Sequence, residues 1–414
     1  RDLHALIPDL DDRAVRLAPL PVWDYGAPDR PRPTRAEARR ALDLPPEARV
    51  LLFFGFIKPY KGLVHLIDAA PRPRFDPDDD IALRVSAIAT GSAEILDSIG
   101  AWEAVVSRRA CPYEHMRVWD GADDPDGPST LRFDADEFAV PQLGFIVENV
   151  LIQHALLAVI DKLDVELRFN TRLEKFDADL VIGADGARSF VRDHFGIAAR
   201  EFPYGQTAVV THVQPERPHQ KTALQRFTQQ GPLGMLPLAD GRVSVVWSLA
   251  DPLADAARDA TDDDLCAMLT AASYYALGAL GVAGPRGAFP LCARHASHYV
   301  MPGLALIGDA AHAVHPLAGQ GANLGLQDAA MLADVVDTAL DAGEFPGDMR
   351  VLRRYERARK GENATMLHFM TGLNRLFATD SALVRDLRVH GMRLFNRSGP
   401  IRSHAVKVAL GVGR

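Results

Sequence analysis

The middle of the chain shows the alternation of apolar and polar positions that is typical of β-strands. Residues 206–249 contain three runs rich in valine, threonine and aromatic side chains, and Ala239-Asp240-Gly241 provides a hairpin turn before the last run. This pattern predicts an antiparallel sheet. Shorter apolar runs predict buried strands at residues 49–54, 131–133, 165–169, 179–182 and 305–307.

Helical periodicity, with apolar side chains three and four positions apart, marks a second set of segments. These segments are residues 35–42, 62–70, 91–99, 146–163, 325–340 and 352–377. Strands and helices that alternate around an antiparallel sheet predict an α/β fold. We expect a Rossmann-like nucleotide-binding core with an inserted antiparallel substrate-binding sheet and C-terminal helices.

The composition is that of a folded globular protein, with 48% hydrophobic and 24% charged residues among 414. No apolar run approaches about 18 residues, so no membrane-spanning helix is expected. The net charge of −8 opposes nucleic-acid binding, although residues 350–414 carry 14 basic and only 4 acidic side chains. Cys111, Cys266 and Cys292 are far apart and lack zinc-site spacing, which predicts no disulfide framework, no structural metal and a reducing cytoplasm.

The strongest chemical signal runs from residue 304 to residue 329, where an apolar strand leads into a glycine-rich loop and then a helix. Asp309, at the end of the strand, can accept hydrogen bonds from the hydroxyl groups of a ligand. Gly319 and Gly321 allow the backbone to approach a ligand closely, and the helix N-terminus favours negative charge. The segment therefore suits a cofactor whose redox-active ring becomes anionic on reduction.

A second apolar strand ends in Asp185-Gly186, with Ser189 and Arg192 at the start of the helix that follows. An isolated Asp-Gly pair usually marks only a turn, but the longer pattern of strand, turn and helix is less common. Arg188 and Arg192 lie four positions apart and can face a phosphate or a ribose.

These two segments resemble the aromatic-hydroxylase family of FAD monooxygenases, and most closely its ubiquinone-biosynthesis branch. The resemblance extends over residues 75–414. It is also carried by LRVSAI at 83–88, PYEHMRVWD at 112–120, LGFIVENVLIQHALL at 143–157, QRF and GPLGMLPL within 225–238, and RRYERARKGEN at 353–363. It implies FAD as cofactor, NAD(P)H as reductant, and transfer of one oxygen atom of dioxygen to an electron-rich ring.

The resemblance also implies which residues touch the cofactor. Asp309 would bind the ribityl chain of FAD, and the loop that ends at Gly321 would line the isoalloxazine. Asp185, Ser189 and Arg192 would serve the pyrophosphate and the approach of NAD(P)H. The cofactor-binding residues expected on this basis are Arg84, Gln153, Asp185, Gly186, Ser189, Arg192, Gly308, Asp309, Pro316, Gly319, Gln320, Gly321, Ala322 and Asn323. No side chain is expected to act as a nucleophile.

The substrate that the resemblance implies is a small aromatic molecule or a polyprenylated quinol, such as a ubiquinone precursor. Because polyprenyl chains reside in the bilayer, the basic and apolar side chains of residues 353–377 suggest peripheral contact of a cytoplasmic protein with the inner membrane face. His312 and His315 lie three apart, but no carboxylate stands at matching spacing. We interpret them as loop or packing residues rather than metal ligands.

One part of the family pattern is missing from the sequence. Neither a strand–GxGxxG–helix unit nor an acidic residue ending a second strand is identified before Arg84. Instead, residues 49–71 resemble the opening of the nucleotide-sugar half of retaining GT-B glycosyltransferases, in which Lys58 and Lys61 would face a diphosphate. A stretch rich in proline and aspartate, residues 71–80, predicts a boundary after this fragment.

The expected division of the chain follows from these patterns. A glycosyltransferase-like fragment at 1–74 precedes an incomplete FAD-binding domain at 75–200 and 301–350, a substrate-binding sheet at 201–300 and C-terminal helices at 351–414. Two alternatives to an active hydroxylase stay open. One is a fusion or truncated remnant that binds FAD weakly or not at all, and the other is a glycosyltransferase fragment.

Overall fold

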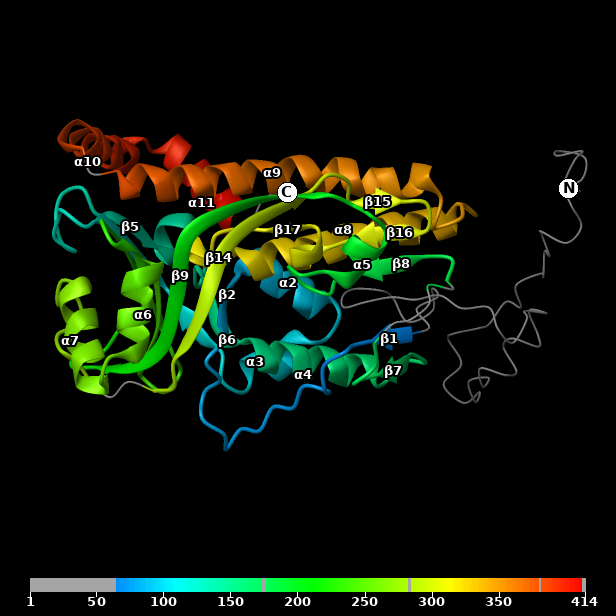
Figure 1. Ribbon diagram of the computed structural model, residues 1–414, viewed down its shortest axis with the longest axis horizontal. Coiled ribbons are helices and arrows are strands. Elements are labelled where there is room, and N and C mark those ends of the chain that lie inside the picture. Colours follow the sequence, from blue (N-terminus) through cyan, green and yellow to red (C-terminus); the bar gives the residue numbers. More distant parts are fainter. Residues whose placement is uncertain (1–64, 173–175, 177, 282–283, 380, 412–414) are drawn as a thin grey trace, which may run out of the picture.

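The antiparallel sheet expected at residues 206–249 is present and extends well beyond them (Figure 1). The computed structural model describes residues 65–172, 176, 178–281, 284–379 and 381–411. Within these ranges the sheet has nine strands. They are β4 (His115–Asp120), β5 (Leu131–Asp134), β9 (Ala199–Pro215), β10 (Thr222–Thr228), β11 (Gly231–Pro237), β12 (Val243–Ala250), β13 (Leu280–Gly281), β14 (Gly287–Ala296) and β17 (His312–Ala313).

One face of this sheet is covered by two short helices, α6 (Asp251–Asp259) and α7 (Asp262–Ala272). Buried side chains of both helices pack on Trp119 and Trp247 of the sheet. The predicted hairpin joins β11 to β12, which pair in antiparallel fashion. The pairing of β10 with β4 is parallel, so the sheet is mixed at that edge.

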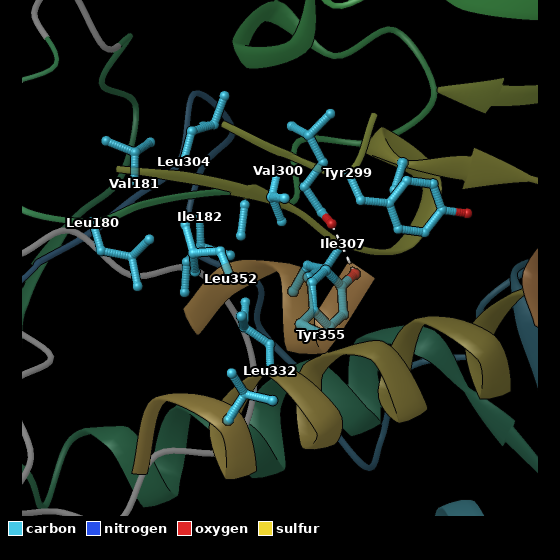
Figure 2. Packing of buried hydrophobic residues seen from close by; sticks show 14 of the residues in the cluster. Leu180, Val181, Ile182, Tyr299, Val300, Leu304, Ile307, Leu332, Leu352 and Tyr355 are labelled. Carbon is cyan, nitrogen blue, oxygen red and sulfur yellow. Dashed lines mark hydrogen bonds between the residues drawn. The ribbon is translucent and has the colours of Figure 1, made fainter. Parts of the chain in front are cut away.

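A second, smaller sheet holds the two strands that carry the sequence motifs. It contains β8 (Val181–Gly183) and β16 (Leu304–Leu306), which pair in parallel, and β15 (Val300–Met301). The helices α8 (Gln320–Asp341) and α9 (Met349–Ala378) pack on this sheet through a core of aliphatic and tyrosine side chains (Figure 2). The Tyr355 hydroxyl donates to the Leu306 carbonyl at 2.8 Å, so the buried phenol of α9 is satisfied by the strand.

A third sheet shows where helical periodicity was misleading. It consists of β2 (Val85–Ala89), β3 (Cys111–Tyr113) and β6 (Gly144–Glu148). The prediction of one helix over residues 146–163 is wrong at its start, because these residues enter β6 before α4 (Asn149–Ile160) begins. Every residue of β6 is buried between its two neighbours. A short apolar run buried on both faces has the same composition in a strand and in a helix. The predicted helix at 91–99 is confirmed as α2 (Thr90–Ser98), which is followed by α3 (Trp102–Val106).

The predicted helix at residues 62–70 is wrong wherever the structure describes it. His65–Ile67 forms the strand β1, which pairs in parallel with β7 (Glu166–Arg168). The Asp68 amide extends this pairing by donating to the Arg168 carbonyl at 2.9 Å. The predicted boundary near residue 74 therefore does not separate β1 from the rest of the fold. The other elements expected in the fragment, at 35–42 and 49–54, and both Lys58 and Lys61 lie outside the described residues.

Two further helices, α10 (Ala382–Arg397) and α11 (Pro400–Leu410), follow α9 at its C-terminal end, and α10 packs beside β5 (Figure 1). The short helix α5 (Phe190–His194) follows β8. Long helices were expected at 325–340 and 352–377, and both predictions are confirmed by α8 and α9. In the described part of the chain, no helix has both the length and the apolar character needed to cross a membrane.

Candidate functional site

The two sequence motifs meet at one edge of the small sheet. Because β8 and β16 are adjacent and parallel, their carboxyl ends lie together, and ligands of open α/β sheets bind at such an edge. Asp185 follows β8, and Asp309 follows β16. Both residues line a single cavity of about 2710 Å³. This exceeds the roughly 300–1,000 Å³ of a typical small-molecule site, so the cavity has room for a large cofactor and a second ligand.

Most of the residues expected to bind a cofactor lie in the wall of this cavity. They are Arg84, Gln153, Asp185, Gly186, Gly308, Asp309, Pro316, Gly319, Gln320, Gly321, Ala322 and Asn323. The structure places Ser189 and Arg192 behind the wall. The Ser189 hydroxyl caps α5 by accepting from the Arg192 amide at 2.9 Å, and the Arg192 guanidinium donates to the carbonyls of Ala187 and Ala310. The Arg192 guanidinium therefore links the two motif loops to each other.

Asp309 presents its carboxylate to the cavity. The side chain is accessible within the hollow, yet it is enclosed by protein, and this enclosure raises the pKa of its carboxyl group. His312 and Arg84 oppose the rise through their attraction for the charged form. Gly308 precedes it with a positive φ of 56°, a conformation that glycine adopts without strain. A carboxylate held this way can accept hydrogen bonds from ligand hydroxyl groups.

The N-terminus of α8 also opens into the cavity. Gly319 caps the helix in the left-handed conformation, with φ of 62°, and a Cβ atom on it would lie 2.9 Å from the Cβ of Ala87. The Asn323 amide holds this turn against β2, because it accepts from the Ala89 amide at 2.9 Å and donates to the Ala87 carbonyl at 2.8 Å. A Cβ on Gly321 would meet no atom within 4 Å, so a ligand can approach the backbone there.

A fully buried ionic network stands behind Asp309. One oxygen of Asp328 accepts from the Gly308 amide at 3.1 Å and lies 2.5 Å from Nε2 of His312. The other accepts from Nε of Arg359 at 2.7 Å and from the Asn363 amide at 3.0 Å. Burial acts to raise the pKa of Asp328, but His312 and Arg359 hold it below its usual value. His312 is therefore a packing residue paired with a carboxylate from a distant helix, and among the described residues no group of three metal-ligating side chains gathers.

Sequence reasoning missed one acidic residue of the site. Asp68 directly follows β1 and lines the cavity. In dinucleotide-binding folds an acidic residue at the end of the second strand binds the ribose of the adenosine. A strand followed by an acidic residue therefore does precede Arg84 in this chain. The signal was the short apolar run HLI followed by aspartate, which the glycosyltransferase interpretation concealed.

The cavity continues into an apolar part that the motifs did not indicate. We call it the apolar arm, and it is enclosed by β4, β5 and β10 on one side and by α9, α10 and α11 on the other. Its lining includes Val118, Leu131, Phe133, Phe227, Met366, Met370, Leu373, Phe377, Met392 and Val406. The Phe227 and Phe377 rings stack with centroids 4.0 Å apart. Such a lining suits a hydrocarbon or an aromatic ring and not a charged ligand.

His315 lies in the cavity wall and directly precedes Pro316 of the glycine-rich loop. Burial lowers the pKa of its imidazole to about 4, so the ring is neutral at physiological pH. The ring packs edge-on against Tyr204, and its Nε2 atom lies 3.4 Å from Oε1 of Gln206. This places an uncharged polar ring within a largely apolar part of the wall.

These features fit FAD, the cofactor that the sequence resemblance implies. Asp68 and Asp309 place carboxylates in the cavity wall, which can accept hydrogen bonds from ligand hydroxyl groups, and the α8 N-terminus has backbone donors and a positive dipole end that favour an anionic group. Gly186, with φ of 83°, and Gly321 leave open space where a side chain would stand. A long, mainly polar ligand with a flat ring can therefore be accommodated along this wall.

Comparisons with known proteins point to the same cofactor. A family model described as an FAD binding domain matches residues 153–369, just over half of the chain. The 3-demethoxyubiquinol 3-hydroxylase of Escherichia coli (strain K12) is 35% identical over 372 residues, which cover 84% of this chain and 92% of that protein. The mitochondrial ubiquinone biosynthesis monooxygenase COQ6 of Homo sapiens is 32% identical over 406 residues, covering 83% and 86%.

Solved structures of similar fold include two from Pseudomonas. PqsL of Pseudomonas aeruginosa, a probable FAD-dependent monooxygenase, has a TM-score of 0.65 at 20% identity and covers 80% of this chain and 92% of its own. The p-nitrophenol 4-monooxygenase PnpA of Pseudomonas putida DLL-E4 has a TM-score of 0.64 at 17% identity, covering 84% and 90%. The glycosyltransferase resemblance of residues 49–71 is not supported by these matches. The chain belongs to the FAD-dependent aromatic hydroxylases, in their ubiquinone-biosynthesis branch, and is an FAD-dependent monooxygenase.

Proposed function

We propose that this protein hydroxylates the ring of a quinol or phenol precursor of ubiquinone, using NAD(P)H and dioxygen. The observation that carries the proposal is the shape of the cavity, in which a polar part at the ends of β8 and β16 continues into the apolar arm. The names of the relatives, which are ubiquinone hydroxylases, support the choice of substrate class. The site residues assigned below are part of this proposal.

The chain's own residues would hold the cofactor at three points. Asp309 would accept hydrogen bonds from the ribityl hydroxyl groups, and Asp68 from the ribose of the adenosine. The backbone at Gly319–Gly321 would face the isoalloxazine, where the dipole of α8 favours negative charge. When bound, FAD supplies the redox chemistry that activates dioxygen. Arg188 and Asp185, which are exposed at the rim of the cavity, would meet NAD(P)H.

The substrate ring would lie where the apolar arm meets the glycine-rich loop. His315 and Pro316 of the glycine-rich loop line the cavity, and Phe227 and Phe377 line the arm. Apolar walls exclude water from the reacting ring, and this exclusion suppresses wasteful side reactions. The remaining length of the apolar arm would hold the polyprenyl chain of the substrate. Because such chains reside in a lipid bilayer, we propose a bilayer as the partner of the C-terminal helices.

The missing glycine-rich loop sets an expectation for affinity. Residues 1–83 contain no GxGxxG motif, so they do not offer its backbone donors and helix dipole to the pyrophosphate. A hydrogen bond to a charged group contributes about 1.5–3 kcal/mol. We therefore propose that FAD binds more weakly to this chain than to relatives that carry the loop, and that added FAD raises its activity.

The proposal is tested with purified protein saturated with FAD. We expect visible flavin absorbance that survives desalting in part, and NAD(P)H oxidation that is stimulated by a short-chain quinol. A colourless protein that stays colourless in excess FAD would support the inactive remnant instead. Binding of a nucleotide sugar, measured by calorimetry, would support the glycosyltransferase fragment.

A further inference from the structure

Three leucines of α10 are mostly exposed. Leu383, Leu387 and Leu394 are 79%, 67% and 71% exposed. Spacings of four and seven residues place them on one face of the helix. Met392, nine positions from Leu383, is buried on the opposite face. We call these three leucines the leucine stripe. A continuous row of exposed leucines on an ordered helix indicates a surface that contacts an apolar partner.

The stripe sits on a firmly anchored helix. Arg388 of α10 is buried, and its Nε atom donates to Asp120 of β4 at 2.8 Å. The same guanidinium donates to the carbonyls of Leu376 and Thr379 at 2.7 and 3.0 Å, which ties the middle of α10 to the end of α9. The orientation of the leucines is therefore set by buried contacts on the other side of the helix.

The charges beside the stripe are positive. Arg385, Arg393, Arg397 and Lys407 are all exposed, whereas the sequences of α10 and α11 contain a single acidic residue, Asp386. The apolar surface also continues onto α11 through Ile401, which is 68% exposed. An amphipathic helix with leucines on one face and basic residues at its sides is typical of segments that lie in the interface of an anionic bilayer.

The apolar arm of the cavity reaches the same two helices. Leu387 of α10 and Val408 of α11 line the arm and are also 67% and 50% exposed. Leu376, at the end of α9, shares both properties. These three side chains therefore mark a mouth of the cavity immediately beside the leucine stripe.

We propose that the α10–α11 face rests on an anionic lipid bilayer and takes the hydrocarbon-chain substrate directly from it through this mouth. The part that concerns the substrate rests on the proposed function, whereas the binding of lipid does not. A second copy of this chain is a poorer occupant, because it would bring two positively charged faces together. Of the apolar side chains that the sequence analysis expected to contact the membrane on residues 353–377, Leu367, Met370 and Phe377 are buried, whereas Phe369 and Leu376 are 57% and 39% exposed.

Vesicle co-sedimentation of the full chain with bound FAD tests the proposal. The probes are vesicles of phosphatidylcholine alone and of phosphatidylcholine mixed with phosphatidylglycerol. We expect binding to the mixed vesicles, and a loss of at least tenfold in the double variant Leu383→Gln with Leu394→Gln. Arg393→Gln should weaken binding about fivefold, on the anionic vesicles alone. Leu253→Gln, at an exposed leucine on α6, is the control and should bind normally.

Activity separates this proposal from the proposed function. Neither Leu383 nor Leu394 lines the cavity, so the double variant should oxidise a water-soluble short-chain quinol at the wild-type rate while losing turnover of a long-chain quinol embedded in vesicles. Unchanged vesicle binding in the double variant would overturn the proposal, as would a fall in its molecular mass in lipid-free solution, which would identify a dimer interface. A wild-type protein that oxidises no quinol would refute the proposed function and leave the lipid contact standing.

Discussion

Nε2 of His312 lies 2.5 Å from Oδ2 of Asp328, and both side chains are buried. The pair joins the loop that carries Asp309 to the middle of α8, and Arg359 of α9 holds the other oxygen of the same carboxylate. The position of the proposed ribityl-binding residue thus depends on charges contributed by two long helices. Removing one member of such a buried group leaves its partners without compensation.

Asp328→Asn should therefore be strongly destabilising. The substitution leaves the guanidinium of Arg359 buried without its counter-charge, and we expect the free energy of unfolding to fall by about 3–5 kcal/mol. Urea denaturation followed by circular dichroism measures the change. Asp334→Asn, at an exposed position of the same helix, should change it by less than about 0.5 kcal/mol. Equal effects of the two substitutions would show that the network contributes little.

Asp309→Ala should weaken FAD binding without unfolding the protein. The carboxylate faces the cavity and would accept hydrogen bonds from FAD, so its loss should raise the dissociation constant roughly 10- to 100-fold. Quenching of flavin fluorescence during titration gives the constant. Asp97→Asn, at an exposed position on α2, serves as the control and should bind FAD normally.

The affinity for FAD should also fall on acidification. Enclosure raises the pKa of Asp309, so its carboxylate takes up a proton at a higher pH than an ordinary aspartate. Ligand hydroxyl groups that donate to the carboxylate favour its charged form, so protonation opposes binding. We expect the dissociation constant of FAD to rise as the pH falls through this raised pKa. The Asp309→Asn variant should lack this pH-dependent rise. A rise of the same size in the wild type and in Asp309→Asn would show that another group is responsible for the pH dependence.

His315 should make the protein acid-sensitive. Its pKa is about 4 in the folded state and near 6.5 in an unfolded chain, so the unfolded state binds the proton more readily. Above about pH 6.5 the imidazole is neutral in both states, so its burial does not lower the free energy of unfolding through protonation. Below that value stability declines by up to about 1.4 kcal/mol per pH unit until the folded pKa is reached. Denaturation at pH 7 and pH 5 should show a smaller difference in His315→Asn than in the wild type.

Gly319→Ala should disrupt the turn before α8. The residue has φ of 62°, and an added Cβ would meet the Cβ of Ala87 at 2.9 Å. Both effects act against the native turn, so we expect lower stability and weaker FAD binding. Gly372→Ala, at an exposed position in α9 where a Cβ meets nothing within 4 Å, should instead stabilise the protein by about 0.5–1 kcal/mol. Thermal unfolding of both variants provides the comparison.

The sequence was most informative where local chemistry and topology agree. The runs that end at Asp185 and Asp309 are strands of the expected type, and their adjacency follows from the rule for parallel sheets. It was least informative for short apolar runs. Residues 65–67 and 146–148 are strands because β7, β2 and β3 pair with them, and the apolar runs there are too short to distinguish a strand from part of a helix.

Side-chain direction was also beyond the sequence. Ser189 and Arg192 belong to the recognised motif, yet they bond to backbone behind the cavity wall. Some of the apolar positions of α9 that indicated a membrane surface, such as Leu367 and Met370, are buried in the protein, whereas three leucines of α10 are exposed. Periodicity identifies the apolar face of a helix, and only the tertiary structure decides whether that face is covered.

The central claim is that this chain transfers oxygen from dioxygen to the ring of a quinol or phenol. The most direct test incubates the FAD-loaded protein with NAD(P)H, a short-chain quinol and heavy-isotope dioxygen, followed by mass spectrometry of the ring product. The account predicts a hydroxylated product that carries one labelled oxygen atom. Consumption of NAD(P)H with hydrogen peroxide as the only oxygen product, or a ring oxygen derived from water, would contradict it.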